Sequence, residues 1–374
     1  MKQTVFNLIK FLVFMTVFIL LLLFTSNIFI PNWKIDKQEG QTYITKGFYS
    51  EKKNTLDVLF VGSSNMYRGV TPMTLYDKYG ITSYTLGNAS ARAWNIYYSL
   101  SSALEYQKPK VVFIDCATLL YQDVENEGNR RKSLDNMPFS YSKLKALSDK
   151  EMVSDEFEVL SYIFPVFRYH DRWKNLNYGD FDKLNKEYRF MTRGYVYADR
   201  FKNFTSSASG YMTASKNKKN INEKTLKYLH KIENLAKEYD FDIVYLGIVD
   251  SKKWNYENSL YVSEYAKSVK RPFIDFNKID IGYDWSTDSI DGVHSNIYGA
   301  NKMTNYIGNY LNNNYELPNH KNDPKYSRWD SDLIDYNFRV KKSYIKLENA
   351  KKKQNDKVNI LDKNKTTKKE IINE

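Results

Sequence analysis

The stretch LDVLFVGSSNMYRG, Leu56–Gly69, decides the fold class. Its first seven residues are mostly apolar and end in Gly62, which is typical of a buried strand of a parallel sheet. Ser63 and Ser64 follow at the point where the strand is expected to turn into a helix. We therefore expect these serine hydroxyls to stand at the carboxyl end of a sheet, next to the N–H groups that open the helix.

The pattern of a short apolar stretch followed by a helical segment recurs along the chain. The further expected strands are SYTLGNAS (83–90), KPKVVFIDCAT (108–118), DIVYLGIVD (242–250) and RPFIDFN (271–277). Such alternation predicts an α/β domain with a parallel sheet and helices on both faces. The rhythm lapses between about 119 and 220, an aromatic-rich segment that we interpret as a long insertion of helices and loops.

The N-terminal segment predicts a transmembrane helix. Residues 11–30, FLVFMTVFILLLLFTSNIFI, form an uncharged apolar run long enough to cross a bilayer. Lys2 and Lys10 precede it, which favours a cytoplasmic N-terminus and an extracytoplasmic domain at the cell membrane. A cleaved signal peptide is the alternative, but no small-x-small site follows the run. The expected parts are an N-terminus with anchor (1–30), a stalk (31–55), the α/β domain (56–318) and a polar basic tail (319–374), disordered or weakly helical from about 341.

Charge and cysteine content narrow the function classes. The net charge is +12, but acids are spread among the basic residues, and the basic tail has no aromatics and no groove-reading motif. Nucleic-acid binding by the tail is therefore the weakest alternative, whereas work beside anionic lipid or wall polymer fits the same balance. The single cysteine, Cys116, excludes an intramolecular disulfide. Neither a metal-ligand spacing nor a nucleotide-binding fingerprint is present, so we expect no metal and no cofactor.

Polar residues at the expected strand ends form a candidate catalytic set. Each has a structural explanation alone, because Ser64 and Asp291 suit helix caps and Gly87 and Asn88 suit a turn. Together with His294 they favour acyl transfer through a serine ester. Ser64 would attack, His294 would take its proton and Asp291 would orient the imidazole. Ser64, Gly87 and Asn88 are the candidates for stabilising the oxyanion.

These motifs resemble those of the SGNH, or GDSL-type, hydrolases. The turn GSS, 62–64, stands where that family has Gly-Asp-Ser, Gly87 matches the oxyanion-hole glycine of the second block, and Asp291 and His294 match the final Asp-x-x-His. The resemblance implies a flavodoxin-like three-layer parallel sheet. It also implies that Ser64, Asp291 and His294 are the catalytic residues.

The third block of the family is not matched. The family has Gly-x-Asn-Asp there, whereas the third expected strand ends FIDCATLLYQD, 113–123, without an asparagine. Asn65, Asn88 or a residue of the insertion would have to supply the missing donor. Asn65 is also a candidate for the substrate groove, together with His170 and Arg172 in FPVFRYHDRW, 164–173, for which a structural aromatic cluster is the alternative.

The Gly-Ser-Ser variant is similar to a membrane-anchored branch of this superfamily, and 57–329 resembles anchored Firmicute proteins of that branch. The branch includes the D-alanine-transfer protein of teichoic acid modification and the acetylation proteins of exopolysaccharide assembly. The resemblance implies an extracytoplasmic esterase or acyltransferase for acyl groups of a cell-envelope glycan or wall polymer, working beside a multi-pass membrane O-acyltransferase. Two alternatives stay open. Water or a sugar hydroxyl could take the acyl group, and a non-hydrolytic chain of this fold could serve as a binding or assembly factor.

Overall fold

The computed structural model describes residues 2–33, 40–120, 126–153, 155–181, 190–214 and 221–372. Its centre is one sheet of five parallel strands in the order β2-β1-β3-β4-β5. The strands are β1 (Val58–Gly62), β2 (Ser83–Gly87), β3 (Val111–Asp115), β4 (Asp242–Gly247) and β5 (Phe273–Asp275). The predicted α/β class and parallel sheet are confirmed, and the strand order is that of flavodoxin-like doubly wound proteins.

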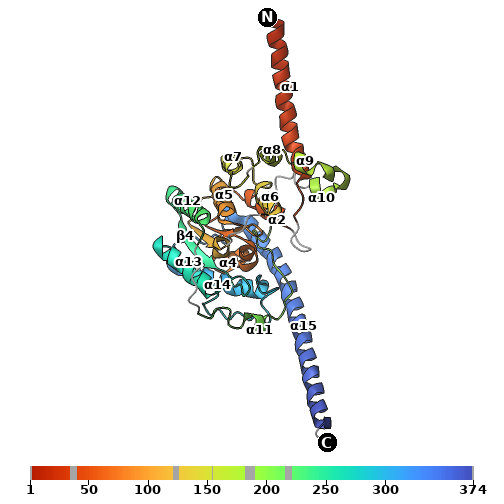
Figure 1. Cartoon of the computed structure of the whole chain (residues 1–374), viewed down its shortest axis with the longest axis vertical. Helices are drawn as coiled ribbons and strands as arrows, with labels where there is room; N and C mark the ends of the chain where they lie inside the picture. The colour runs from red at the N-terminus through yellow and green to blue at the C-terminus, as the bar shows by residue number, and fades with distance from the viewer. Residues whose placement is uncertain are drawn as a thin grey trace.

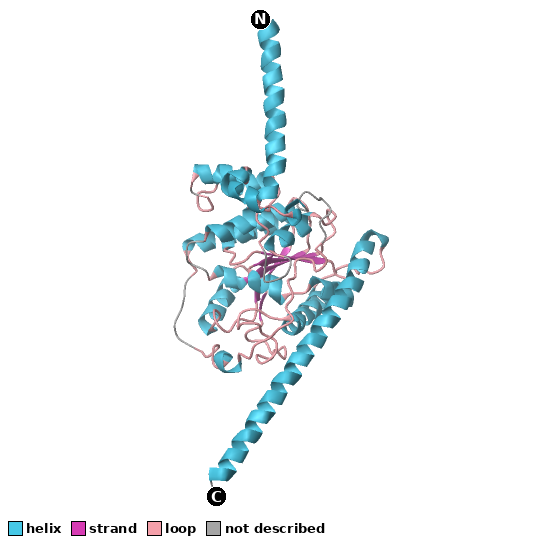
Figure 2. Cartoon of the chain, turned by 90° about the vertical axis from the view of Figure 1, so that its right-hand side faces the viewer, coloured by secondary structure: helices cyan, strands magenta, loops and turns pink. Residues whose placement is uncertain are grey.

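Helices cover both faces of the sheet, so the domain has three layers (Figure 1). Successive residues of β1 serve opposite faces: Phe60 packs in one core cluster and Leu59 in the other, as the two-residue period of a strand requires. The helices of the first face are α3 (Ser64–Gly69), α4 (Pro72–Tyr79) and α14 (Ile297–Asn314). Those of the second face are α2 (Gln41–Tyr49), α5 (Ala93–Leu104), α12 (Glu223–Tyr239) and α13 (Tyr256–Ser268). Figure 2 shows the sheet enclosed between them.

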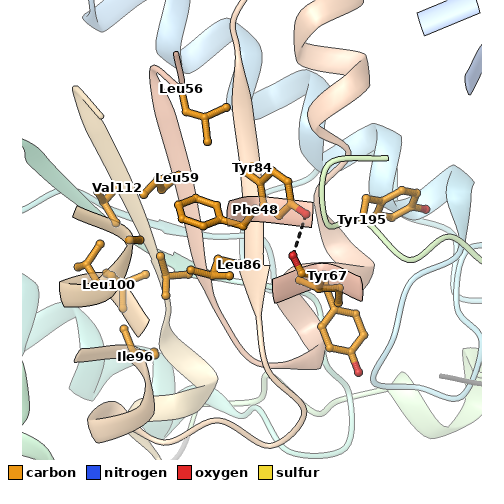
Figure 3. Packing of buried hydrophobic residues seen from close by; sticks show 14 of the residues in the cluster. Phe48, Leu56, Leu59, Tyr67, Tyr84, Leu86, Ile96, Leu100, Val112 and Tyr195 are labelled. Carbon is orange, nitrogen blue, oxygen red and sulfur yellow. Dashed lines mark hydrogen bonds between the residues drawn. The ribbon is translucent and has the colours of Figure 1, made fainter. Parts of the chain in front are cut away.

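Within the expected stalk, 31–55, the helix α2 packs against the domain. In α2, Ile44 and Phe48 are fully buried, and the Phe48 ring meets the Tyr84 ring of β2 edge-to-face at 5.3 Å between centroids (Figure 3). Tyr84 Oη donates a hydrogen bond of 2.8 Å to the Ile44 carbonyl. The expected stalk is therefore corrected for α2, which packs on the sheet through Ile44 and Phe48, four residues apart on one side of the helix. Residues 34–39 of that segment lie outside the described residues.

The C-terminal segment is also more ordered than expected. After η5 (Pro324–Tyr326) it forms one long helix, α15 (Ser327–Ile372). Trp329, Tyr336 and Leu347 are buried at spacings that put them on one side of that helix. Asp332 pairs with Arg193 at 2.6 Å, and both side chains are fully buried. The segment expected as a polar tail from 319 therefore packs on the domain as far as Leu347, which lies beyond position 341, from which we expect disorder or weak helicity.

The N-terminal helix α1 (Lys2–Ser26) is long and apolar enough to cross a membrane, and η1 (Asn27–Phe29) follows it. Figures 1 and 2 show α1 projecting from the domain. The described elements of the insertion are η2 (Cys116–Leu119), α6 (Glu127–Leu134), α7 (Tyr141–Ser148), α8 (Glu156–Ile163), α9 (Val166–Tyr169), η3 (His170–Asn175), α10 (Tyr178–Phe181) and α11 (Thr205–Ala208). Residues 121–125, 154, 182–189 and 215–220 of the insertion lie outside the described residues.

Candidate active site

The structure brings Ser64, His294 and Asp291 together at the carboxyl edge of the sheet. Ser64 is the first residue of α3, directly behind β1, and its Oγ lies 2.9 Å from His294 Nε2. His294 Nδ1 lies 2.8 Å from Asp291 Oδ2. Both distances are within ordinary hydrogen-bond range, so His294 is placed to take the Ser64 proton while Asp291 holds the imidazole in position.

The charge of Asp291 fixes the direction of these bonds. Burial alone would raise the pKa of Asp291, but the hydrogen bond and charge of His294 and the N–H groups of Val293 and His294 outweigh it and hold the pKa well below its usual value. The carboxylate therefore stays ionised and accepts the Nδ1–H of His294. That leaves the lone pair of Nε2 to accept the Ser64 hydroxyl proton.

The loop that carries Asp291 and His294 is a tight turn closed on itself. Ser289 and Ser295 form an antiparallel bridge across it, and the Ile290 N–H donates to the His294 carbonyl at 2.9 Å. Gly292 has φ of +86°, a left-handed conformation that favours glycine. The glycine of this motif is thus required by the turn that brings the two side chains together.

The buried carboxylate of Asp115 binds Ser63 and not Ser64, so the two adjacent serines have different roles. Asp115, the last residue of β3, accepts the Ser63 N–H at 2.9 Å and the Ser63 hydroxyl at 2.5 Å. Burial raises the pKa of Asp115, although the bonds from Ser63 and from the Ala117 N–H oppose this effect. Ser63 is fully buried, whereas Ser64 is partly exposed. Ser64 is therefore the serine available to a substrate.

The candidate oxyanion donors lie around this turn. Among the described residues, the Ser64 N–H has no acceptor, and it opens α3 beside the Ser64 hydroxyl. Gly87 approaches the turn so closely that a Cβ on it would lie 2.8 Å from the Ser63 carbonyl oxygen. The Asn88 N–H donates to the Gly62 carbonyl at 2.8 Å, and Asn88 Nδ2 donates to the Asn129 carbonyl of α6 at 3.1 Å. Asn88 thus closes the turn and holds α6 with groups that were expected to serve the oxyanion.

Asn65 is next to the nucleophile, but its side chain points into the protein. It is 2% exposed, and its Nδ2 donates to Asp250 Oδ2 at 3.2 Å. Asp250 in turn accepts the N–H groups of Lys252 and Lys253 with its other oxygen. Burial raises the pKa of Asp250 against these bonds. Asn65 therefore ties α3 to the loop after β4 and does not line a groove with this side chain.

The structure does not bring His170 and Arg172 together with Ser64. Both lie in η3, which contacts η1 at the end of α1. Arg172 Nη1 donates to the Phe29 carbonyl at 2.6 Å, and Arg172 Nη2 pairs with Asp180 at 2.7 Å. The side chain of His170 is largely exposed. His170 and Arg172 therefore lie at the base of the N-terminal helix and not in the expected substrate groove.

A different part of the insertion runs beside the catalytic loop. The Val196 N–H donates to the Tyr67 carbonyl of α3 at 2.8 Å, and the Lys202 N–H donates to the Ser289 carbonyl at 3.0 Å. The Ile297 N–H, which opens α14, donates to the Ala198 carbonyl at 3.2 Å. Residues 196–204 therefore connect the serine helix with the histidine loop, a role that no periodic pattern in the sequence indicates.

Two further polar residues at the site escape sequence analysis. Gln41 of α2 donates to the Gly87 carbonyl at 2.5 Å and accepts the Ala89 N–H at 3.1 Å, so a residue of the expected stalk holds the second turn. Asp115 has one recognisable signal, because Asp250 and Asp275 also stand at the ends of apolar strand segments. A repeated aspartate at strand ends indicates buried acceptors for loop N–H groups.

Comparisons with known proteins add little to this geometry. No family model matches the chain, and no curated protein matches it. Among solved structures, a crystal structure from Bacteroides fragilis described as "a putative acylhydrolase" matches with a TM-score of 0.35 and 13% identity, over 75% of this chain and 99% of that chain. In the described part of the chain, no cluster of three or more His, Cys, Asp and Glu residues is suited to a metal ion.

Proposed function

We propose that this chain is a membrane-anchored serine esterase or acyltransferase of the SGNH type that works through an acyl-Ser64 intermediate. The observation that carries the proposal is the chain of short contacts from Ser64 Oγ to His294 Nε2 and from His294 Nδ1 to Asp291. A serine used only as a helix cap does not need an oriented imidazole. Here Ser63 supplies the cap of α3 by accepting the Asn65 N–H, which leaves Ser64 free of that task.

The first half-reaction follows from the directions of these bonds. Ser64 Oγ attacks the carbonyl carbon of an ester while its proton passes to His294 Nε2. The Ser64 N–H is placed to bind the developing oxyanion. Collapse of the tetrahedral intermediate breaks the bond to the leaving alcohol, which takes the proton from His294. The acyl group then remains on Ser64.

The second half-reaction returns the acyl group to an acceptor. Water or a sugar hydroxyl attacks the acyl-Ser64 carbonyl, His294 takes the proton of the attacking group, and Ser64 leaves with that proton. Hydrolysis and transfer differ only in the acceptor. The geometry of Ser64 and His294 supports either outcome equally.

The substrate class and location are proposed from the ends of the chain and from its charge. The apolar helix α1 with Lys2 and Lys10 favours a domain held outside the membrane. A net charge of +12 suits an anionic cell-envelope polymer. We therefore propose acylated glycan or wall polymer as the substrate and a multi-pass membrane O-acyltransferase as a partner.

Ester turnover by the purified full-length protein tests the proposal. We expect the wild type to cleave an acetylated chromogenic ester and Ser64→Ala to lose at least about 10³-fold in kcat, because the nucleophile is gone. Ser63→Ala is the matched control and should keep most of the activity, since its hydroxyl bonds to Asp115 instead of His294. An equal loss in both variants would contradict the assignment of the nucleophile.

An acceptor arm separates hydrolase from transferase. Adding a glycan acceptor should accelerate release of the chromophore, with the acetyl group recovered on the glycan, if transfer is the natural reaction. Release that no acceptor changes would count against transfer. A wild type that neither turns over esters nor reacts at Ser64 would favour the non-hydrolytic assembly factor, for which the absent third-block asparagine is the supporting observation.

A further inference from the structure

We propose that the insertion carries a membrane-docking surface that rests in the phospholipid headgroup region around the end of α1. The docking surface comprises exposed aromatic residues between the turn before α7 and the end of α10: Phe139, Tyr141, Phe167, Trp173, Tyr178 and Phe181. This inference rests on the proposed membrane insertion of α1. It goes beyond the proposed enzymatic function, because none of these residues takes part in the catalytic site.

The distribution of exposed apolar side chains sets this surface apart. In the described part of the chain outside α1, the large exposed apolar side chains concentrate in the insertion. The others are Tyr239 and three residues of α15, Ile334, Phe338 and Ile345. Tyr178 is 86% exposed and Trp173 is 64% exposed, so both rings face solvent in the absence of a partner. A cluster of exposed aromatics of this kind indicates an interaction surface.

The position of the surface identifies the partner. Figure 1 shows α7–α10 at the level of the lower end of α1. η1, which directly follows α1, contacts α9, η3 and α10. Arg172 fixes this arrangement through its hydrogen bond to the Phe29 carbonyl and its ion pair with Asp180. A bilayer crossed by α1 would therefore end where the aromatic side chains begin.

The depth of the contact matches the thickness of the headgroup layer. Leu23 and Phe24 of α1 line a cavity together with Met137 and Phe139 of the insertion. From Leu23 to Phe29 a helix rises by roughly 9 Å. The headgroup region of one leaflet is about 5–8 Å thick. The cavity and the η1 contacts therefore place the insertion beside the layer in which amphipathic aromatic rings are most favourable.

The chemistry of the surface also suits headgroups. Lys145 Nζ lies 4.4 Å from the ring centre of Tyr141, and Lys174 Nζ lies 5.7 Å from that of Trp173. Paired aromatic and ammonium groups can bury their apolar parts while the charges reach phosphate. The cavity beside α1 has a volume of about 620 Å³, and Lys46 is among its lining residues. It offers phospholipid a recess between the membrane helix and the domain.

Site-directed fluorescence on the full-length chain tests the proposal. Cys116 is fully buried, and burial raises the pKa of its thiol, so it should resist labelling. Tyr178→Cys and Phe139→Cys place a label on the docking surface. Ile334→Cys, at a site 73% exposed on α15, is the control. Leu12→Cys in α1 reports whether the helix is inserted.

Each variant is labelled with an environment-sensitive fluorophore and reconstituted in vesicles of phosphatidylcholine and phosphatidylglycerol in equal parts. We expect lipids spin-labelled at the headgroup to quench the labels at Tyr178→Cys and Phe139→Cys several-fold more than the label at Ile334→Cys. Lipids spin-labelled in the acyl chain should quench Leu12→Cys.

The outcomes separate the two proposals. Quenching of Leu12→Cys with no excess quenching at Tyr178→Cys would overturn the docking surface and leave the anchor intact. Absence of quenching at Leu12→Cys would remove the anchor and the docking surface together. Shielding of the Tyr178→Cys label in detergent that grows with protein concentration would identify a second copy as the occupant and overturn the bilayer.

Discussion

At the residue scale, two adjacent serines differ in function because of the acceptor that each hydroxyl meets. Ser63 donates to the buried Asp115, and Ser64 donates to His294. Sequence patterns could predict Ser64, Asp291 and His294, because the spacing of their motifs is local and each follows an expected strand. The aspartates at strand ends indicate that Asp115 is a buried acceptor, but not that it binds Ser63, because that contact depends on β3 lying beside β1.

Three further expected site residues lie elsewhere for a related reason. Asn65 and Asn88 are next to the site in sequence, but the Asn65 side chain donates to Asp250 and the Asn88 side chain donates to the Asn129 carbonyl. His170 has aromatic neighbours in the sequence, and the structure places that segment at the base of α1. The residue type alone does not reveal which way a side chain points.

A buried lysine in the insertion makes stability depend on pH. Lys143 is 5% exposed, and burial lowers its pKa to about 8, against the attraction of Asp135 and with the repulsion of Arg131. Between pH 8 and the ordinary lysine value of about 10.4, the unfolded chain keeps this proton and the folded chain has lost it. The contribution of Lys143 to the free energy of unfolding therefore rises with pH across this window, by up to roughly 3 kcal/mol.

Urea unfolding of the wild type and Lys143→Met in detergent, at pH 7 and pH 10, checks this expectation. The unfolding free energy of the wild type minus that of Lys143→Met should be larger at pH 10 than at pH 7. Subtracting the variant from the wild type removes the contributions of other titrating groups. Comparing this difference at the two pH values then removes the pH-independent loss of the hydrogen bond from Lys143 to the Met137 carbonyl. A difference that is the same at both pH values would contradict it.

At the scale of elements, the strands could be predicted from the sequence, whereas the packing of α2 and α15 on the domain could not. Apolar runs ending at glycine or aspartate define β1, β3 and β4 because a buried parallel strand must be apolar on both faces. By contrast, the apolar residues of α2 and of the first half of α15 lie outside the strand–helix alternation that defines the domain. Their burial depends on the partner that the tertiary fold supplies, such as Tyr84 for Phe48.

The start of α14 offers a test of how these elements support the site. Asn296 is fully buried, its Oδ1 accepts the Tyr298 N–H at 3.0 Å, and its Nδ2 donates to the carbonyls of Thr287 and Arg200. We expect Asn296→Ala to lose about 1–2 kcal/mol of stability, as for other helix caps. We also expect a fall in kcat of about tenfold or more, because His294 lies two residues away in the same loop.

Asn222→Ala is the matched control for this prediction. Asn222 caps α12 by accepting the Thr225 N–H at 2.7 Å, and no catalytic residue lies in that turn. Its loss should lower stability by a similar amount and leave kcat unchanged. If the two variants lose activity equally, the activity loss at Asn296 reflects stability alone.

At the scale of the whole molecule, the domain extends beyond its sheet at both ends of the chain. A chain ending at Gln354 keeps the described contacts of α15, including the hydrogen bond from Tyr298 to Glu348. We expect its unfolding temperature to equal that of the full chain. A chain ending at Tyr326 lacks Asp332 and Trp329, so Arg193 keeps its ion pair with Glu51 but loses the Asp332 carboxylate and the indole ring that covers it, and we expect a clearly lower unfolding temperature. Equal thermal unfolding of the two shortened chains in detergent would contradict the inclusion of α15 in the domain.

The central claim is that Ser64 is a nucleophile activated by His294. It is tested most directly by mass spectrometry of the full-length protein after reaction with a fluorophosphonate. We predict one adduct, located on Ser64, present in Ser63→Ala and absent in Ser64→Ala. We also predict that Asp291→Asn forms the adduct at least about tenfold more slowly, because the imidazole loses its orienting carboxylate. No adduct in the folded wild type, or an adduct that Ser64→Ala retains, would contradict the account.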